Sequence, residues 1–368
     1  MPEEIVRKNM STLGFCLILY LILGNVIASV VSGFSALIVV IGRMTGRLSG
    51  DVMSMITSLT SSSWYALTLN AVVMYVISMP LVAWIIRSRI PTSGVRRWLP
   101  GYAELPAGQD AAFRQSAGEK PIRLRDIPAL IPICVFFMAA GSTVSSVLAS
   151  LIGDIAGVEA SNSQVEMLLS GNLLATILFV VIIAPVAEEL FFRKLIIDTV
   201  RPAGRRAAVF VSAFSFALFH TNLFQFFYAF FLGLLLALVY IKTRNVLIPI
   251  LMHMLLNFSG GVILPYVSKD LLVVDTGVLR DGSPEQMLAL VRDYPMLVAF
   301  LIIYSLLSFA GMVILLIWMA KGRFRLVERY DAVPYGTFLG AFFTAPGQIL
   351  YILVCIVLSV VMLVMNGA

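Results

Sequence analysis

Long apolar stretches that lack charged side chains dominate this 368-residue chain and restrict the folds open to it. Most of them reach the ~20 residues that a helix needs to cross a bilayer. A backbone inside lipid must satisfy its own hydrogen bonds, so spanning segments of this length form helices. About nine stretches are recognisable, near 13–41, 64–87, 127–151, 168–190, 207–220, 223–241, 246–267, 295–319 and 346–366. The sequence therefore predicts an all-α polytopic membrane protein with about eight to nine transmembrane helices.

The composition supports this class and excludes others. Hydrophobic residues make up 60% of the chain and charged residues 12%, against about 25% charged in soluble domains. The net charge of +6 comes with no basic run interleaved with aromatic residues, so we expect no nucleic-acid partner. Three scattered cysteines, Cys16, Cys134 and Cys355, show no CxxC spacing and are predicted to be free thiols packed as small apolar side chains.

The distribution of Lys and Arg predicts the orientation. Basic residues gather in the loops 88–126, 191–206, 242–245 and 320–340, whereas the loop 152–167 carries acidic residues and no basic one. Basic loops mark the cytoplasmic side. We therefore expect an integral protein of a prokaryotic plasma membrane, with an uncleaved first helix, a cytoplasmic N-terminus and an external C-terminus.

Three regions follow from where the polar residues lie. Residues 1–125 are interpreted as two accessory transmembrane helices plus a cytoplasmic loop, and residues 268–368 as an external loop and two C-terminal transmembrane helices. The region 126–267 contains every conspicuous polar residue of the apolar segments and is predicted to be the catalytic core.

Ionisable residues inside membrane helices are costly and indicate function. The first such group is Glu188-Glu189 with Arg193, after an uncharged run. Glu189 and Arg193 are four residues apart, so they share a helix face and can pair, which leaves Glu188 available. Taken alone, the group is equally typical of charges at the end of a membrane helix.

The second and third groups contain the two histidines of the chain. His220 ends a short apolar segment, with Phe216 one turn earlier on the same face. His253 and Asn257 are four residues apart in another apolar segment and therefore share a face. Either group alone fits a structural hydrogen bond between helices.

Together these groups contain what amide hydrolysis requires. Glutamate, two histidines and asparagine on three helices offer a general base, a polarising group and donors for a developing oxyanion. Two histidines and one glutamate are also a recognised catalytic zinc set. The candidate metal ligands are Glu188, His220 and His253, although no HExxH motif is present. The residues leave a zinc mechanism and a metal-free glutamate mechanism open.

The three motifs resemble those of a known family. Glu-Glu-x-x-x-Arg at 188–193, Phe-x-x-x-His at 216–220 and His-x-x-x-Asn at 253–257 are similar, in order and placement, to the CPBP family. This is the family of CAAX-protease and bacteriocin-processing intramembrane peptidases, which are relatives of the type II CAAX prenyl endopeptidase. The resemblance implies a helical bundle with an interior catalytic cavity.

The resemblance also implies roles for the catalytic residues. Glu188 would activate water with His220, and His253 with Asn257 would hold the oxyanion. Glu189 and Arg193 would organise the site, with Phe216 as further support. The implied substrate is a peptide or a membrane-associated protein, in contact with the lipid bilayer; the oligomeric state is not readable from the sequence.

Two other classes of function remain open at this stage. A proton-coupled transporter would use the same glutamate and histidines as a proton relay, but the inverted repeats typical of such proteins are not visible in the sequence. A non-catalytic membrane scaffold would keep the same residues for structure alone.

The predicted boundaries raise one difficulty about depth. They place Glu188 near the cytoplasmic end of its helix and His220 near the outer end of a segment that rises about 21 Å. The two residues would then not meet. Because Phe191, Phe192, Leu195 and Ile196 continue the apolar pattern, we expect the fourth helix to extend to about residue 197.

Overall fold

The computed structural model describes residues 2–46, 49–90, 107–158, 160, 172–268, 282–328 and 332–367. These residues form helices and connections, with no strand among them. Eight of their helices are long and apolar enough to cross a membrane. The eight spans are Glu3–Thr45, Trp64–Arg89, Leu124–Ala156, Leu173–Ala203, Leu223–Thr243, Leu247–Val267, Pro295–Ala320 and Pro346–Met365. The predicted fold class is therefore confirmed.

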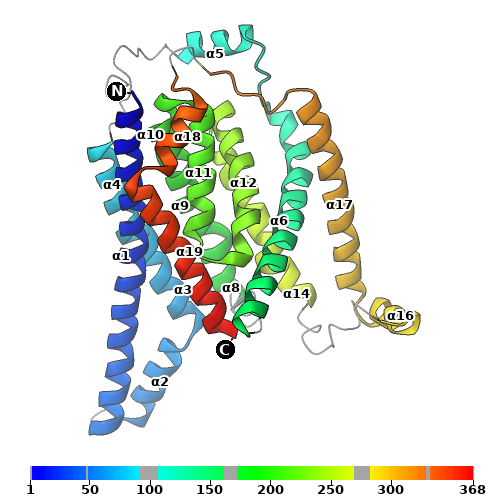
Figure 1. Cartoon of the computed structure of the whole chain (residues 1–368). Helices are drawn as coiled ribbons and strands as arrows, with labels where there is room; N and C mark the ends of the chain where they lie inside the picture. The colour runs from blue at the N-terminus through cyan, green and yellow to red at the C-terminus, as the bar shows by residue number, and fades with distance from the viewer. Residues whose placement is uncertain are drawn as a thin grey trace.

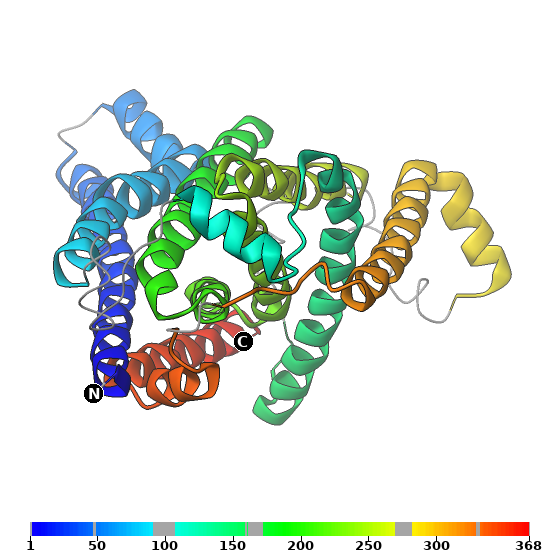
Figure 2. The ribbon, with the colours of Figure 1, turned by 90° about the horizontal axis from the view of Figure 1, so that it is seen from above.

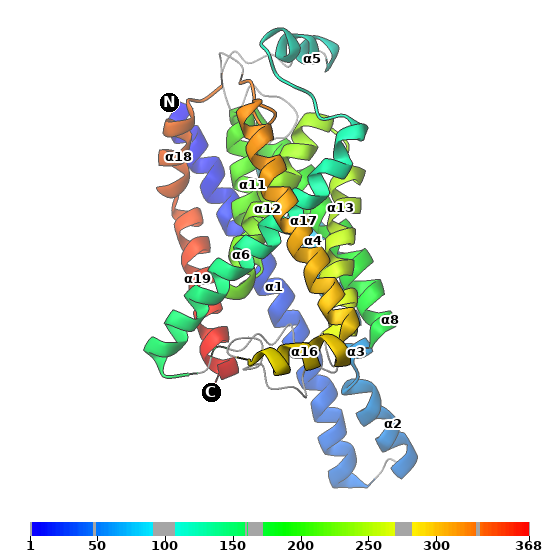
Figure 3. The same cartoon turned by 90° about the vertical axis from the view of Figure 1, so that its right-hand side faces the viewer.

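The N-terminal part is a long helix followed by a broken second span. Helix α1 has 44 residues, about 66 Å of helix against ~30 Å of hydrocarbon. Its far end and α2 extend beyond the other helices (Figure 3). The elements are α1 (Pro2–Thr45), α2 (Gly50–Thr60), α3 (Ser63–Ala71), the π-helical η1 (Val72–Ser78), α4 (Met79–Arg89) and α5 (Ala107–Ser116). Helix α5 lies in the loop 88–126; residues 91–106 of that loop lie outside the described residues.

The middle of the chain corrects one predicted boundary. The residues 191–203, expected to begin a cytoplasmic loop, continue the fourth span to Ala203. This extension was the expected solution to the depth difficulty, and it goes six residues further than predicted. The elements are η3 (Leu124–Asp126), α6 (Ile127–Ala156), α8 (Leu173–Ala175), η4 (Thr176–Ile183), α9 (Ala184–Glu188), η5 (Glu189–Ile197), α10 (Asp198–Val200) and η6 (Arg201–Ala203).

A glycine turn then sends the chain back into the bundle. Gly204 has φ +153°, in the region that favours glycine, and α11 (Arg205–Phe219) starts directly after it. Glu188 and His220 each lie 16 residues from Gly204, about 24 Å of helix. The two residues therefore sit at matching depths. Helix α11 has 15 residues, too few for a full span, which leaves eight candidate spans where nine apolar segments were expected.

Small residues let the central helices pack closely. After α11 the chain continues through α12 (Leu223–Thr243), α13 (Leu247–Phe258), the π-helical η7 (Ser259–Ile263) and α14 (Leu264–Ser268). A side chain at Gly141 of α6 would collide with the backbone of Tyr228 on α12. One at Gly233 of α12 would come within 3.0 Å of Ala213 on α11. These contacts hold α6, α11 and α12 together around the site.

The C-terminal part packs on both sides of this core. It comprises α16 (Pro284–Asp293), α17 (Pro295–Ala320), α18 (Tyr335–Phe343) and α19 (Pro346–Gly367). Helix α17 lies along α6 at the edge of the bundle, and α19 lies along α1 (Figures 1 and 2). One apolar core includes Val6, Phe191 and Tyr351 and so joins the three predicted regions. The division into 1–125, 126–267 and 268–368 stays a prediction.

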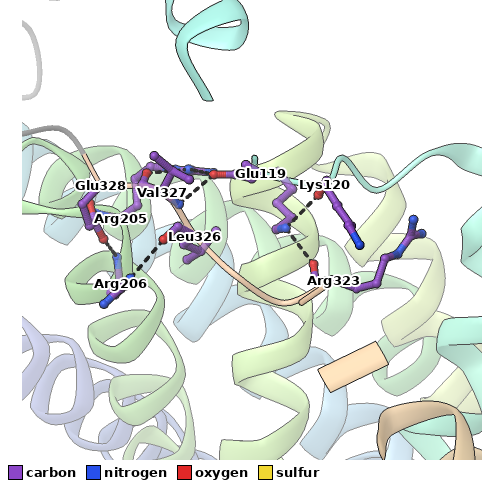
Figure 4. A network of polar contacts seen from close by, with 9 residues as sticks. Glu119, Lys120, Arg205, Arg206, Arg323, Leu326, Val327 and Glu328 are labelled. Carbon is purple, nitrogen blue, oxygen red and sulfur yellow. Dashed lines mark hydrogen bonds and ion pairs between the residues drawn. The ribbon is translucent and has the colours of Figure 1, made fainter. Parts of the chain in front are cut away.

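The basic loops meet at one end of the bundle, which we call the basic end. The N-terminus, α5 and the start of α18 lie there, and the C-terminus lies at the opposite end (Figure 1). A polar cluster joins separate elements at this end (Figure 4). Both guanidinium Nη atoms of Arg205 donate to Glu119, whose Oε2 also accepts the backbone N–H of Val327 at 2.8 Å. Glu328 accepts the backbone N–H groups of Arg205 and Arg206 at the start of α11.

This cluster predicts a loss of stability in acid. Burial by itself would raise the pKa of the Glu119 carboxyl, but the hydrogen bonds from Arg205 and Val327 outweigh it and hold the pKa below the usual value of 4.5. The stabilisation is therefore present at neutral pH and disappears as the pH falls through this lowered pKa. We expect Glu119→Gln to lower the free energy of unfolding by about 1–3 kcal/mol at pH 7. Thermal unfolding in detergent from pH 7 to 3 measures it, and an unchanged gap between the two proteins at pH 3 would contradict the assignment.

Candidate active site

The adjacent glutamates lie in different environments. Glu188 ends α9 and Glu189 begins the π-helical segment η5. The Glu189 side chain is 0% exposed, whereas that of Glu188 is 18% exposed. A π-helical turn changes the direction in which successive side chains point and is frequent at functional sites. The carboxylate of Glu189 is thus fully buried (sealed) and that of Glu188 is accessible, as the sequence predicted.

Arg193 neutralises the sealed carboxylate. Its Nε lies 3.0 Å from Glu189 Oε2, and both side chains are fully buried. Its guanidinium carbon lies 4.3 Å from the centre of the Phe216 ring. Arg193 Nη1 and Nη2 have no hydrogen-bond partner among the described residues. The ion pair and the aromatic ring are therefore what compensates this buried charge.

His253 connects the two carboxylates. Its Nδ1 lies 2.9 Å from Glu189 Oε1, and its Nε2 lies 3.9 Å from Glu188 Oε2. A carboxylate only accepts hydrogen bonds, so the short contact assigns a proton to Nδ1 when Glu189 is ionised. Nε2 is then turned toward Glu188. The distance of 3.9 Å is too long for a direct hydrogen bond but suits a bridging water.

His220 approaches from the end of α11. Its Nδ1 lies 2.8 Å from the Phe216 carbonyl oxygen, which places the proton on Nδ1, and its ring packs edge-on against Phe216 at 4.7 Å. Phe216 also meets the His253 ring edge-on at 5.8 Å. His220 lies within electrostatic range of Glu188 and His253. The structure therefore brings Glu188, Glu189, His220 and His253 together, with Arg193 and Phe216 beside them.

Asn257 lies at the edge of this group and contacts a backbone carbonyl. Its Nδ2 donates to the Val180 carbonyl oxygen at 2.9 Å. Val180 belongs to the π-helical η4, in which a carbonyl bonds the N–H five residues later. That residue is Pro185, which has no N–H. Asn257 thus satisfies an acceptor that the proline leaves free, and its expected role in holding the oxyanion stays a prediction.

Sequence reasoning missed the tyrosines around Glu188. Tyr75 in η1 donates its hydroxyl to Glu188 Oε1 at 3.1 Å. Tyr20 of α1 and Tyr228 of α12 also lie within electrostatic range of this carboxylate. The available signal was weak, because a tyrosine in an apolar helix is ordinary. Two of the three lie in helices that were interpreted as accessory.

The geometry of the histidines bears on the candidate zinc set. In the part of the chain that the structure describes, no group of three or more His, Cys, Asp or Glu side chains is arranged to hold a metal ion. His253 Nδ1 is engaged by Glu189, and His220 Nδ1 by a carbonyl. These contacts leave both Nε2 atoms free and are of the kind that metal-ligating histidines also make, so the zinc set stays a prediction.

Comparisons with known proteins match part of the chain. Residues 170–259 match the family model of the type II CAAX prenyl endopeptidase, Rce1-like. The chain is also 36% identical over 123 residues to the membrane-embedded CAAX protease MroQ of Staphylococcus aureus (strain USA300). That similarity covers 31% of this chain and 48% of the relative, so the chain spans about half the length of the curated relative that it matches. No solved structure gives a significant match.

Proposed function

We propose that the protein is an intramembrane endopeptidase of the CPBP family, because residues 170–259 match the Rce1-like family model and 123 residues of the chain are similar to a membrane-embedded CAAX protease. Its substrate is a peptide, or a segment of another protein at or in the bilayer. The observation that carries this proposal is the pairing of one accessible carboxylate, Glu188, with the Nε2 atom of His253 across 3.9 Å. The sealed Glu189–Arg193 pair holds that histidine in place.

The proposed first step is attack by water. A water between Glu188 Oε2 and His253 Nε2 donates one hydrogen to each atom and keeps a lone pair for the scissile carbonyl. Its oxygen bonds to the carbonyl carbon, its proton passes to Glu188, and the carbonyl electrons form an oxyanion. Glu188 then delivers this proton to the leaving nitrogen as the C–N bond breaks. Glu188 is the general base and then the general acid.

His220 is the proposed partner of the oxyanion. Its Nδ1 proton is committed to the Phe216 carbonyl, so a second proton on Nε2 makes the ring a cationic donor. Burial of the ring opposes that cation, and the carboxylate charge of Glu188 offsets part of this cost. This proposal exchanges the roles expected of the two histidines, because His253 and not His220 faces Glu188 at a distance suited to a shared water.

The orientation is part of the proposal. The Lys and Arg residues gathered at the basic end support a cytoplasmic location of that end and of the N-terminus. The site then lies about 24 Å of helix away from Gly204, within the bilayer. A substrate must therefore reach the glutamate from lipid or through the bundle.

Comparative peptidomics of membranes tests this function. We compare membranes that contain the wild type, Glu188→Gln, or the control Glu285→Gln, which removes an exposed carboxylate from α16. Fragments present with the wild type and the control, and absent with Glu188→Gln, are expected. Identical peptide sets from all three would contradict a peptidase. Proton-coupled uptake lost in Glu188→Gln proteoliposomes would instead favour a transporter.

Cleavage is expected to withstand a metal chelator. Glu188 and His253 Nε2 lie at a distance suited to a shared water, and no group of three or more His, Cys, Asp or Glu side chains among the described residues is arranged to hold a metal ion, so the proposed mechanism uses Glu188 as the base. Purified protein is dialysed against a strong chelator, and cleavage is measured with and without added Zn²⁺. Loss of more than about 90% of the activity, restored by Zn²⁺, would contradict the metal-free mechanism.

A further inference from the structure

The hydroxyl of Tyr75, which lies outside residues 170–259, contacts the proposed base Glu188. Tyr75 lies in η1, between α3 and α4, and donates to Glu188 Oε1 at 3.1 Å. The two residues are 113 positions apart. The contact occupies Oε1 and leaves Oε2, the oxygen that faces His253 Nε2 at 3.9 Å. The two oxygens of one carboxylate therefore have separate partners.

Close packing of the accessory span holds Tyr75 in place. A side chain at Gly24 of α1 would meet the sulfur of Met74, the neighbour of Tyr75, so α1 and η1 lie in close contact there. Ser35 of α1 shares a hydrogen bond of 2.6 Å with Tyr65 of α3. Trp64 of α3 packs edge-on against Phe179 of η4 at 5.9 Å. These contacts fasten the span to α1 on one side and to the span that carries Glu188 on the other.

Tyr75 lies in a π-helical part of its span. Residues Val72–Ser78 form one π-helical segment with Tyr75 near its centre, within the span Trp64–Arg89. Such segments widen a helix locally and change where its side chains point. The carboxylate that receives the hydroxyl belongs to a span with π-helical segments of its own, η4 and η5. The hydrogen bond thus joins two helices that both depart from regular α-helix near the site.

We propose that Tyr75 is a positioning residue for Glu188, so that the second span completes the active site. The inference rests on the proposed peptidase function and extends it beyond residues 170–259. By holding Oε1, the hydroxyl selects one rotamer of Glu188 and directs Oε2 to the water shared with His253. Positioned groups of this kind act on the chemical step and not on substrate binding.

Kinetics of Tyr75→Phe test the proposal. We expect kcat to fall about tenfold with KM nearly unchanged, because one hydrogen bond to a charged group is lost and the ring is kept. The matched control is Tyr65→Phe, which removes a phenol hydroxyl of the same span that bonds Ser35 instead of Glu188. The control is expected to keep the wild-type kcat. Equal kcat values for Tyr75→Phe and the wild type would overturn the inference and leave the proposed function standing.

A double variant separates positioning from a general effect on folding. Aspartate at position 188 is one methylene shorter and is expected not to reach the Tyr75 hydroxyl. Tyr75→Phe should therefore lower kcat about tenfold beside Glu188 and change it little beside Glu188→Asp. The same tenfold loss in both backgrounds would assign Tyr75 a structural role only.

Chemical labelling of Glu188 tests its contact with Tyr75 even if no substrate is cleaved. Glu188 is labelled with a lipid-soluble carbodiimide in the full-length protein, and the adduct is quantified by mass spectrometry. Because the hydroxyl occupies Oε1, labelling is expected to become several-fold faster in Tyr75→Phe and to stay unchanged in Tyr65→Phe. Equal labelling rates in all three proteins would show that Tyr75 does not hold Glu188.

Discussion

Purified Glu188→Gln protein is expected to cleave its substrate about 10²–10⁴-fold more slowly than the wild type, the range that a general base contributes. Glutamine keeps the size of the side chain and can still accept the Tyr75 hydroxyl, but it cannot take a proton from water. The Glu188 side chain is 18% exposed and forms no ion pair with Arg193, unlike Glu189. The fold should therefore be retained, and single-turnover kinetics with a thermal unfolding scan measures both quantities.

Variants of the histidines extend this test. His253→Gln and His220→Gln should each lower kcat, the first by loss of the water position and the second by loss of the oxyanion partner. Because these residues act as one unit, their combined loss should be much smaller than the product of the single losses. Wild-type rates in all three single variants, with unchanged unfolding temperatures, would contradict a peptidase site at this position.

Arg193→Met is expected to be the most destabilising single change in the site. It removes the cation and leaves Glu189 charged in an environment that is 0% exposed for both side chains. Breaking a buried pair in this way costs about 3–5 kcal/mol of stability. It also removes the cation from the face of Phe216, which packs against both histidines. A large drop of the unfolding temperature in detergent, together with loss of cleavage, is the expected result.

Two controls test whether the uncompensated Glu189 charge causes the loss of stability in Arg193→Met. Arg292→Met removes an arginine whose side chain is 77% exposed and paired with Asp293 outside the site, and it should leave the unfolding temperature unchanged. The double variant Glu189→Gln/Arg193→Met removes both charges and should recover part of the lost stability. A double variant that is less stable than Arg193→Met would show that an uncompensated Glu189 charge is not the cause.

Local spacing was sufficient to predict the pairs that lie on one helix. Glu189 and Arg193 pair because residues four apart share a helix face, and Phe216 contacts His220 for the same reason. The apolar pattern predicted the spans, since lipid tolerates few charges. It ended the apolar segment at residue 190, because Arg193 and Lys194 look like the charged end of a helix, and even the extension to about residue 197 was too short. In the structure Glu189 pairs with Arg193 and Asp198 with Lys194, so the span extends to Ala203.

Contacts between distant segments were not predictable in this way. Asn257 bonds Val180 across 77 positions and Tyr75 bonds Glu188 across 113. Each depends on how far one helix is shifted along another, which no periodicity in a single chain records. The same holds for Gly24, whose lack of a side chain matters only because Met74 of another span lies against it.

The sequence by itself therefore determined the class of the protein and indicated the candidate reactive groups. Long uncharged runs allow only helices in a membrane, and ionisable residues kept inside such runs mark a site. Only the tertiary structure decided which group faces which. It turned His253 toward Glu188, committed Asn257 to a carbonyl freed by Pro185, and brought Tyr75 to the proposed base. The physical reason is that hydrogen bonds act over about 3 Å, a distance set by the packing of helices and not by their order in the chain.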